Sequence, residues 1–443
     1  MPNWQGIPHD QKAVDVLVLG GGAAGVCAAI AAARSGRRVL LVEGQGCLGG
    51  SRTATGVDTF YGFYTPKEQR RIVGGIPWEI AQELAARGAA FERPNTYGAG
   101  TGITYDVEQL KLLYESLVLE AGAELLFHTY ASLVQTEQGR VTGIVLANKL
   151  GLTEVSAQVY IDATGDADIA ARAGAPFEKN AAHELQSLST IFFMGGVDTS
   201  TAKTISHAGL AERMREANQS GRYTLPREEG SWHITPHPGV IQANMVRVSG
   251  VDATDPYALT LAEVEGRRQT QQYVRFLRDC VPGFEEAYLL STSSQIGVRE
   301  TRRILGHYVL TEEDVVKGAK FDDAIACCGA PIEDHGAGKD TRWVYVQDDG
   351  SYQIPYRCLL PQGVSNLIVA GRSLSATHGA QASARNSAQC MAMGQAAGVA
   401  AALCVEQALP AATAPVQELQ RRLLAQGVIL SASVGASSQI IPN

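Results

Sequence analysis

The chain has 443 residues, enough for two domains, and 45% of them are hydrophobic while 19% are charged, so a large core can form. Its 37 basic and 45 acidic residues give a net charge of −8, which argues against nucleic acid or an anionic membrane as the main partner. No apolar run is long enough to span a bilayer and the polar segment Met1 to Lys12 lacks the apolar stretch of a secretory signal, so we expect a cytoplasmic protein with no membrane partner.

The first predicted unit is a strand, a glycine-rich turn, a helix and a second strand. An apolar run from Val14 to Leu19 is typical of a buried parallel strand. The next six residues, Gly20-Gly21-Gly22-Ala23-Ala24-Gly25, fit the pattern G-x-G-x-x-G. An Ala-rich helix and a second apolar strand that leads to Glu43 complete the unit.

Each part of this unit has a physical role in binding a dinucleotide. Gly20 permits the tight turn, Gly22 lets the backbone approach a pyrophosphate, and Gly25 lets the helix pack closely on the strand. The N–H groups at the start of the helix hold the phosphates. Glu43 lies 18 residues after Gly25, where an acceptor for the ribose hydroxyls belongs. The complete order favours dinucleotide binding over a structural turn without a ligand.

The next segments predict a glycine-rich connection and two helices. We expect the loop at 44–53 to pass beneath the ribose and pyrophosphate. The aromatic run from Thr59 to Tyr64, which contains Tyr61, fits the lining of a ligand cavity or simple core packing equally well. Helices are predicted at 76–87 and 106–120.

Further strands are predicted to return to the sheet. They lie at 123–134, 141–146 and 155–161, with a hairpin turn at 138–139. Directly after the last strand, Ala163-Thr164-Gly165-Asp166 place small residues and backbone amides where a cofactor can approach closely.

The pattern changes between about residues 176 and 350. Short strand candidates (188–194 and 240–248) and polar helices (259–280 and 312–317) replace the regular alternation of strand and helix. We therefore predict an inserted second domain for substrate recognition, with domains at 1–175, 176–350 and 351–443.

Two groups of polar residues in this region have open interpretations. Trp232, His233 and His237 lie in a Pro/Gly-containing stretch and either face a ligand or are solvated, and their spacing does not favour a metal site. Three arginines at 299, 302 and 303 form either a salt-bridged surface or a site in which Arg299 reaches an anionic substrate group or supports a cofactor.

The sheet pattern returns near the C-terminus. A short strand at 366–372 ends in a turn at Gly371-Arg372, and a run of small residues follows His378. A long helix at 388–408 begins near Asn386-Ser387, so its positive end faces an electron-rich group. A short amphipathic helix is predicted at 416–427.

The eight cysteines show no spacing typical of zinc or iron–sulfur ligands, so we expect no metal site and mostly free thiols. Cys47 is interpreted as a packing residue rather than a covalent cofactor anchor.

Taken together, these segments resemble the FAD-dependent oxidoreductases of the glutathione-reductase-like flavoproteins, and are distantly similar to fumarate reductase and succinate dehydrogenase flavoproteins. The resemblance covers nearly the whole chain. Its motifs are the Gly20–Gly25 turn with Glu43, Leu48-Gly49-Gly50, Ala163-Thr164-Gly165-Asp166, Gly297-Val298-Arg299-Glu300, Ala370-Gly371-Arg372 and Met393-Gly394-Gln395-Ala396-Ala397-Gly398.

This resemblance implies an α/β fold with a Rossmann-like FAD-binding domain, assembled from both ends of the chain, around an inserted β-rich α+β substrate domain. It implies that Gly50 and Ser51 lie along the cofactor and that the helix after Asn386 faces the isoalloxazine. Some relatives carry iron–sulfur cysteines, whose absence here argues against a self-contained electron-transfer chain. The covalent attachment motif of the fumarate reductase group is also absent, which implies non-covalent FAD.

The leading functional hypothesis is hydride transfer between a small organic substrate and flavin N5. His378 is the leading candidate for proton transfer because it is the one side chain in its segment that titrates near neutral pH. Arg385 and Arg299 are candidates for binding a carboxylate, with Tyr61 as a further candidate.

Two alternatives remain open. One is an NAD(P)H-dependent flavoprotein reductase, although the sequence has no second G-x-G-x-x-G unit. The other is a flavin-bearing subunit that acts only with an electron-transfer or tRNA partner. The external electron acceptor or donor is not specified by the sequence, and a homo-oligomer is possible.

Overall fold

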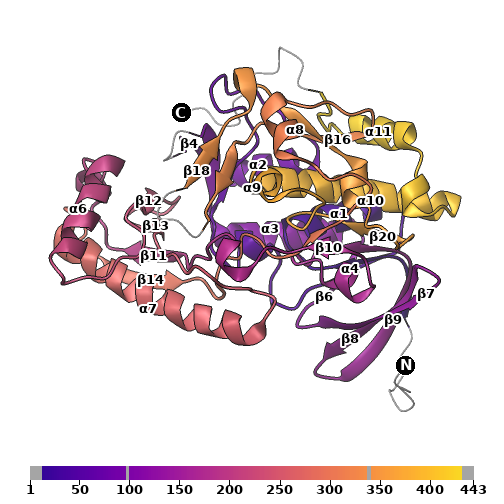
Figure 1. Ribbon diagram of the computed structural model, residues 1–443, viewed down its shortest axis with the longest axis horizontal. Coiled ribbons are helices and arrows are strands. Elements are labelled where there is room, and N and C mark those ends of the chain that lie inside the picture. The colour runs from indigo at the N-terminus through magenta and orange to yellow at the C-terminus, as the bar shows by residue number, and fades with distance from the viewer. Residues whose placement is uncertain (1–11, 96–98, 337–340, 432–443) are drawn as a thin grey trace.

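The computed structural model describes residues 12–95, 99–336 and 341–431, and Figure 1 shows a main body with a smaller lobe beside it. The main body contains a seven-stranded sheet in the order β6-β2-β1-β9-β8-β7, and β20 also pairs with β9. The pairs β1–β2, β1–β9, β2–β6 and β9–β20 are parallel. These strands are β1 (Lys12–Leu19), β2 (Val39–Val42), β6 (Glu124–Leu126), β7 (Tyr130–Glu137), β8 (Arg140–Asn148), β9 (Gly151–Asp162) and β20 (Leu367–Val369).

Two helices from opposite ends of the chain pack together against this sheet. They are α1 (Ala23–Arg34) and α10 (Ser387–Gln407), and their close approach depends on glycine. A Cβ at Gly394 would lie 2.0 Å from the carbonyl oxygen of Ala24, and one at Gly398 would lie 2.3 Å from that of Ala28. The first and last parts of the chain therefore form one body.

The remaining elements of the main body lie around this pair. The helices are α2 (Ile76–Ala86), α3 (Val107–Glu120), α4 (Asp168–Arg172), α8 (Glu312–Lys317), α9 (His378–Ala384) and α11 (Val416–Ala425). A three-stranded sheet has the order β3 (Thr59–Phe60), β5 (Thr101–Tyr105) and β4 (Ala90–Pro94). Two-stranded pairs are β10 (Phe177–Glu178) with β15 (Arg303–Ile304), β16 (Ala324–Cys328) with β19 (Tyr352–Pro355), and β17 (Ile332–Asp334) with β18 (Arg342–Val344).

The smaller lobe is built on a four-stranded antiparallel sheet with helices α5, α6 and α7 (Figure 1). Its elements are α5 (Thr199–Ala202), α6 (His207–Gln219), α7 (Pro256–Cys280) and the strands β12 (Ser231–Ile234), β13 (Ile241–Asn244), β11 (Phe192–Gly195) and β14 (Tyr288–Thr292). Its hydrophobic core draws on residues between 188 and 296, whereas apolar residues at 310–354 pack into the main core. The α/β class with a parallel sheet is confirmed, while the domain limits at 175 and 350 stay predictions.

Three local features differ from the sequence-based expectation. The strand predicted at 123–134 is broken into β6 and β7, because His128 adopts a left-handed conformation (φ 51°) and its N–H donates to the carbonyl of Gln45. The segment after His378 is helix α9 rather than an irregular connection. Helix α6 was not predicted, although Leu210, Met214 and Ala217 have helical spacing on its buried face.

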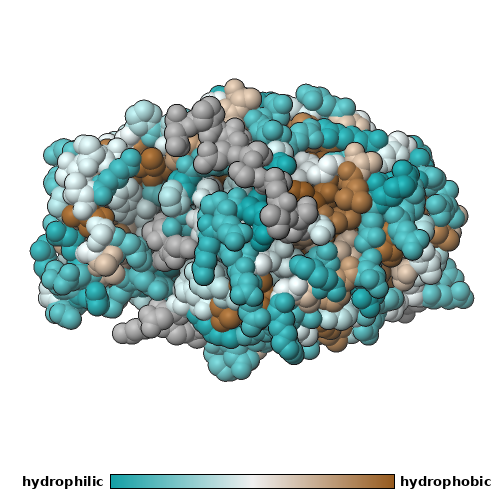
Figure 2. Space-filling view, turned by 90° about the horizontal axis from the view of Figure 1, so that it is seen from above, coloured by the Kyte–Doolittle hydropathy of each residue, from teal (hydrophilic) through white to brown (hydrophobic). Residues whose placement is uncertain are grey.

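One helix within the described ranges, α10, is long and apolar enough to cross a membrane, so the statement that no apolar run has this length is wrong. However, 94% of its most apolar window is buried inside the molecule, as expected for a core helix. Figure 2 shows one face of the molecule, which hydrophilic residues cover for the most part. The cytoplasmic location stays a prediction, and residues 1–11, which bear on it, lie outside the described part of the chain.

Candidate cofactor and substrate site

The turn between β1 and α1 is shaped by glycines that have different neighbours. Gly20 has a φ of +96°, and a Cβ there would lie 2.5 Å from the carbonyl oxygen of Ala163. A Cβ at Gly25 would lie only 1.8 Å from the carbonyl oxygen of Gly20. Gly22 differs, because its Cβ would meet nothing within 4 Å. Gly20 and Gly25 are thus required by packing, whereas Gly22 borders open space.

The open space beside Gly22 suits an anion. The first turn of α1, which includes Ala23 and Ala24, has no acidic side chain and no side-chain cap. Backbone N–H groups at a helix start, with the helix dipole behind them, attract negative charge. The turn therefore fits the pyrophosphate of a dinucleotide.

Glu43 and the loop that follows it lie against the same turn. Its carboxylate accepts the N–H of Gly21 at 2.7 Å and that of Gln45 at 2.8 Å. The N–H of Gly49 donates to the carbonyl of Gly21 at 2.7 Å, and a Cβ at Gly50 would lie 3.1 Å from the Cα of Gly22. Ser51 is exposed beside this contact. The segments 20–25 and 43–51 therefore form one continuous surface.

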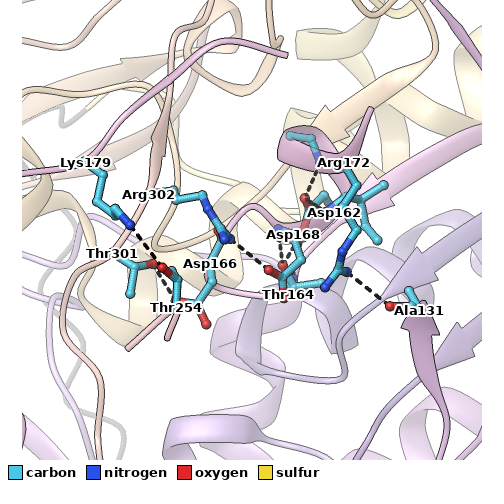
Figure 3. Close-up of polar contacts among 12 residues, drawn as sticks. Ala131, Asp162, Thr164, Asp166, Asp168, Arg172, Lys179, Thr254, Thr301 and Arg302 are labelled. Atoms are coloured by element: carbon cyan, nitrogen blue, oxygen red, sulfur yellow. Dashed lines mark hydrogen bonds and ion pairs between the residues drawn. The ribbon is translucent and has the colours of Figure 1, made fainter. Parts of the chain in front are cut away.

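The segment 163–166 connects this surface to the arginine-rich segment and to the turn after β20. Asp166 accepts from Arg372 at 2.8 Å and from Thr301 at 2.6 Å. Figure 3 shows Asp166 and Thr301, and next to them Arg302, which donates to Asp168 at 2.9 Å. Asp166, Arg372 and Arg302 therefore act as cross-links between segments in this structure.

Close contacts also restrict the residues that flank this network, namely Thr164, Gly165 and Gly371. The hydroxyl of Thr164 donates to Asp162, whose pKa is raised by burial. A Cβ at Gly165 would lie 2.8 Å from the Arg372 guanidinium. Gly371, with a φ of +100°, approaches Ala24 on α1, where a Cβ would lie 3.1 Å from that of Ala24.

The N-terminus of α10 meets Tyr61. Asn386 is the N-cap residue, and neither a side-chain cap nor an acidic residue occupies the first turn. The N–H of Tyr61 donates to the Ser387 hydroxyl at 3.0 Å, and the N–H of Ala388 donates to the carbonyl of Tyr61 at 3.1 Å. The sequence-predicted residues Tyr61, Asn386 and Ser387 are thus brought together at the positive end of the helix.

A group of half-buried charged side chains lies next to this helix start. Arg385 donates to the side chain of Gln186 at 3.0 Å and to the carbonyl of Glu333 at 3.1 Å. Arg299 donates to the carbonyl of Ser187. Burial, and then the charge of Arg385, lower the pKa of Arg299 to about 9. Burial also lowers the pKa of Arg385. The two arginines named by the sequence therefore share one desolvated region.

Two further residues of this region, Glu333 and His335, were missed by the sequence. They hydrogen-bond to each other at 2.9 Å. Burial opposes the ionisation of Glu333, but the interaction with His335, followed by the charges of Arg385 and Arg299, lowers its pKa to about 2. Burial, followed by Arg299, lowers the pKa of His335 to about 3, so its imidazole is neutral. The pair sits in β17 and the residues after it, and no local motif marks it.

His378 is held between two carboxylates. Its Nδ1 lies 2.8 Å from Glu300 and its Nε2 lies 3.1 Å from Asp334. Hydrogen bonds to Asp334 and Glu300 raise its pKa to about 9. The expectation that His378 titrates near neutral pH is therefore wrong, because both ring nitrogens are bound by acids that the sequence did not place there. Its role in proton transfer stays a prediction.

A second histidine joins the lobe to the main body. His233 in β12 lies 2.8 Å from the carboxylate of Asp58, which directly precedes β3. Its neighbour His237 instead pairs with Asp106 at 2.9 Å and is 60% exposed. The two histidines have a similar sequence context, but the structure buries most of the His233 side chain and leaves that of His237 exposed.

The eight cysteines are free thiols, and Cys47 is partly buried beside Thr53. Across the residues that the structure describes, no group of three or more His, Cys, Asp or Glu side chains is arranged to hold a metal ion.

Comparisons with known proteins agree with this geometry. A family model described as FAD dependent oxidoreductase matches residues 15–423. A digeranylgeranylglycerophospholipid reductase of Methanoculleus marisnigri is 32% identical over 36% of this chain and 41% of its own length. A second such reductase, from Methanopyrus kandleri, is 31% identical over 34% of this chain and 37% of its own. The chain thus matches about two fifths of the length of these curated relatives.

Two solved structures are also similar to this chain. A geranylgeranyl bacteriochlorophyll reductase-like protein from Thermoplasma acidophilum has a TM-score of 0.46 and 14% identity, covering 95% of this chain and 85% of its own. A p-nitrophenol 4-monooxygenase from Pseudomonas putida has a TM-score of 0.44 and 11% identity, covering 94% and 84%. The match over residues 15–423 is the decisive one: the chain belongs to the family of FAD-dependent oxidoreductases, and its cofactor is FAD.

Proposed function

We propose that this enzyme transfers a hydride between a small organic anion and N5 of non-covalently bound FAD. When bound, FAD supplies a ring that accepts or returns two electrons with a proton equivalent. The turn at Gly20–Gly25, Glu43 and the loop at 48–51 would hold the dinucleotide. The segment around Tyr61, Arg299 and Arg385 would bind the substrate.

The observation that carries this proposal is the environment of Arg299. Its side chain is half-buried, burial contributes most to lowering its pKa, and its guanidinium donates to a neutral acceptor, the carbonyl of Ser187. Within the described part of the chain, no carboxylate lies within ion-pair distance of Arg299. A half-buried cation without an acidic partner is partly desolvated at a cost in free energy, so an anionic ligand would stabilise it.

The charges around Arg299 support the same conclusion. Arg385, Arg227 and Arg247 all contribute to lowering its pKa, whereas Glu333 opposes them. Glu229 pairs with Arg247 at 3.1 Å and with Arg227 at 3.6 Å, so these two guanidinium groups share an acidic partner, whereas Arg299 has no such ion pair within the described ranges. Carboxylate or phosphate groups are the natural complement of guanidinium groups because both can accept two parallel hydrogen bonds.

The N-terminus of α10 supports the redox part of the proposal. Its positive end stabilises negative charge nearby, and neither a side-chain cap nor an acid neutralises it. Tyr61 is fixed to its first turn by backbone hydrogen bonds. The side chains that would bind an anion therefore surround a helix end suited to an electron-rich ring.

The test is anaerobic mixing of the FAD-loaded enzyme with a panel of carboxylates and phosphorylated metabolites, each paired with a neutral amide or ester analogue. Loss of the visible flavin absorption with the acid, but not with its neutral analogue, is the expected result. Bleaching by the neutral analogues alone would overturn the anionic substrate. No bleaching with any donor, together with no reoxidation of chemically reduced enzyme by any acceptor, would overturn the proposed transfer.

Variants of Arg299 add a residue-level test. Arg299→Gln should raise the KM about 100-fold, because a charge-assisted contact of about 3 kcal/mol is lost, while Arg299→Lys should lose less. Arg267→Gln, which removes a half-exposed guanidinium on α7, is the matched control and should leave the KM unchanged. Acid precipitation of the protein should release intact FAD, and flavin that stays with the pellet would contradict non-covalent binding.

A further inference from the structure

The pair formed by Asp58 and His233 lies at the junction between the main body and the smaller lobe. Asp58 precedes β3 of the main body, and His233 lies in β12 of the lobe. Their side chains approach to 2.8 Å, with Asp58 only 1% exposed and the His233 side chain 13% exposed. The second carboxylate oxygen of Asp58 is buried without a hydrogen-bond partner in the described residues. This is a polar contact placed where two cores meet, and it costs free energy of desolvation.

The contact determines which ring nitrogen of His233 carries the proton. A carboxylate only accepts hydrogen bonds, so the Nε2 of His233 donates to Asp58. In the neutral ring, Nδ1 then carries the free lone pair. Within the described ranges Nδ1 forms no hydrogen bond, and the side chain is 13% exposed. Nδ1 is therefore a free acceptor on a partly exposed ring.

The groups that face His233 keep its ring neutral. Burial lowers the pKa of His233 more than Asp58 raises it, and Arg93 lowers it further. Arg93 is fixed nearby, because it donates to the hydroxyls of Thr104 at 2.8 Å and Thr59 at 3.2 Å. The ring therefore combines a fixed tautomer with an open lone pair, which are the requirements for a general base.

A short segment links this pair to the proposed substrate region. Asp58 and Tyr61 are three residues apart, and Tyr61 is bonded to the first turn of α10. The Tyr61 phenol has its pKa raised mainly by burial, with further contributions from Glu333 and Asp58. The Tyr61 phenol is thus influenced by the charges of both Asp58 and Glu333, and Glu333 in turn accepts a hydrogen bond from Arg385 through its carbonyl.

We propose that His233 is the proton-transfer residue of this enzyme and that Asp58 is its positioning residue. This proposal rests on the proposed function. In the oxidative direction, the C–H and O–H (or N–H) bonds of the substrate break and a C=O (or C=N) bond forms. The hydride with its electron pair goes to the flavin, and the proton goes to Nδ1 of His233. The resulting imidazolium is stabilised by Asp58, and its proton later leaves to solvent.

The first test concerns the ring itself and needs no substrate. Nitrogen-15 NMR of the FAD-loaded enzyme labelled in histidine should show that the ring of His233 is neutral with its proton on Nε2 at neutral pH. The signal is assigned by its loss in His233→Gln. An imidazolium or a proton on Nδ1 at pH 7 would overturn the proposal. In Asp58→Asn, the amide of the new side chain donates to Nε2, so the proton should move to Nδ1.

The second test uses stopped-flow flavin reduction with a substrate that bleaches the parent enzyme. His233→Gln and Asp58→Asn should slow reduction about 10²- to 10⁴-fold, with little change in KM. The parent rate should fall as pH drops through the pKa of His233, and this dependence should be absent in His233→Gln. His237→Gln, which removes the exposed histidine four residues away, should reduce its flavin at the parent rate.

These outcomes distinguish a failure of the proposal for His233 from a failure of the proposed function. If the parent flavin reacts with no substrate, the proposed function fails, while the NMR result still decides the state of His233. If the parent reacts and His233→Gln reacts equally fast, proton transfer by His233 is wrong. Thermal melting and FAD content of each variant show whether it is folded. Should His233→Gln fail to fold, Asp58→Asn decides the question through its tautomer and its rate.

Discussion

Different kinds of contact shape the cofactor turn at residues 20–25 and the junction between the main body and the smaller lobe. At the cofactor turn, contacts of the backbone determine the shape, and Gly20, Gly25 and Glu43 lie within one stretch of the chain. At the junction, side chains from distant segments meet, as Asp58 and His233 do across 175 positions. The first region can be predicted from a sequence pattern, whereas the second forms only when the chain folds.

The difference also separates two kinds of function. The turn presents neutral backbone donors to an anion, and its fit depends on the absence of side chains. The junction presents an acidic side chain, Asp58, and a titratable one, His233, whose pKa is lowered by burial. Changes in the turn should therefore act on folding and cofactor affinity, and changes at the junction on protonation and chemistry.

The largest effect is expected for Gly25→Ala. Its Cβ would lie 1.8 Å from the carbonyl oxygen of Gly20, and neither backbone segment can move without disturbing α1. Such overpacking costs about 3 kcal/mol or more, so the protein should be strongly destabilised. Urea unfolding of the apoprotein measures this. An apoprotein as stable as the parent would show that the close approach is not rigid.

Gly22→Ala sharpens the comparison within the same turn. Its Cβ meets no protein atom within 4 Å, and its φ of −70° suits alanine, so the apoprotein should be as stable as the parent. The methyl group would instead occupy space needed by the pyrophosphate, and FAD affinity should fall about 100-fold. Titration of apoprotein with FAD measures the change. Unchanged affinity would place the pyrophosphate elsewhere.

Glu43→Ala and Glu43→Gln should have smaller effects on FAD affinity. Loss of a charge-assisted bond to the ribose costs about 1.5–3 kcal/mol, so Glu43→Ala should weaken binding roughly ten- to a hundred-fold. Glu43→Gln keeps an acceptor for the N–H of Gly21 and should lie between Glu43→Ala and the parent. Equal FAD affinity in all three proteins would show that Glu43 only supports the turn.

The sequence predicted features that depend on local patterns and missed features that depend on tertiary contacts. The turn, the long core helix and the parallel strands were predicted because hydrophobic periodicity and glycine spacing are local. The break at His128 was not, since it depends on a hydrogen bond to Gln45 in a distant loop. The sequence named Arg299, Arg385 and Tyr61 as site residues but gave no sign of Glu333 or His335, whose roles come from tertiary contacts.

His378 shows the same limit and gives the last prediction. The sequence identified a titratable histidine, but its partners Glu300 and Asp334 come from other segments. Glu300 also forms an ion pair with Arg303, and the charge of Arg342 contributes to lowering the pKa of Asp334. His378 therefore lies in a cluster of charged side chains. These contacts raise the pKa of His378 in the folded state to about 9 from the ordinary value of 6.5.

A folded-state pKa above the unfolded value means that the folded protein holds this proton more tightly. The resulting stability is fully present below pH 6.5 and is lost as pH rises through about 9. His378→Gln should therefore lower the free energy of unfolding by up to about 3 kcal/mol at pH 6, and by much less at pH 9.5. Urea unfolding of both proteins at the two pH values measures this, and groups common to both cancel in the difference. A difference that is the same at both pH values would contradict a charged His378, and would return this residue to the candidates for proton transfer near neutral pH.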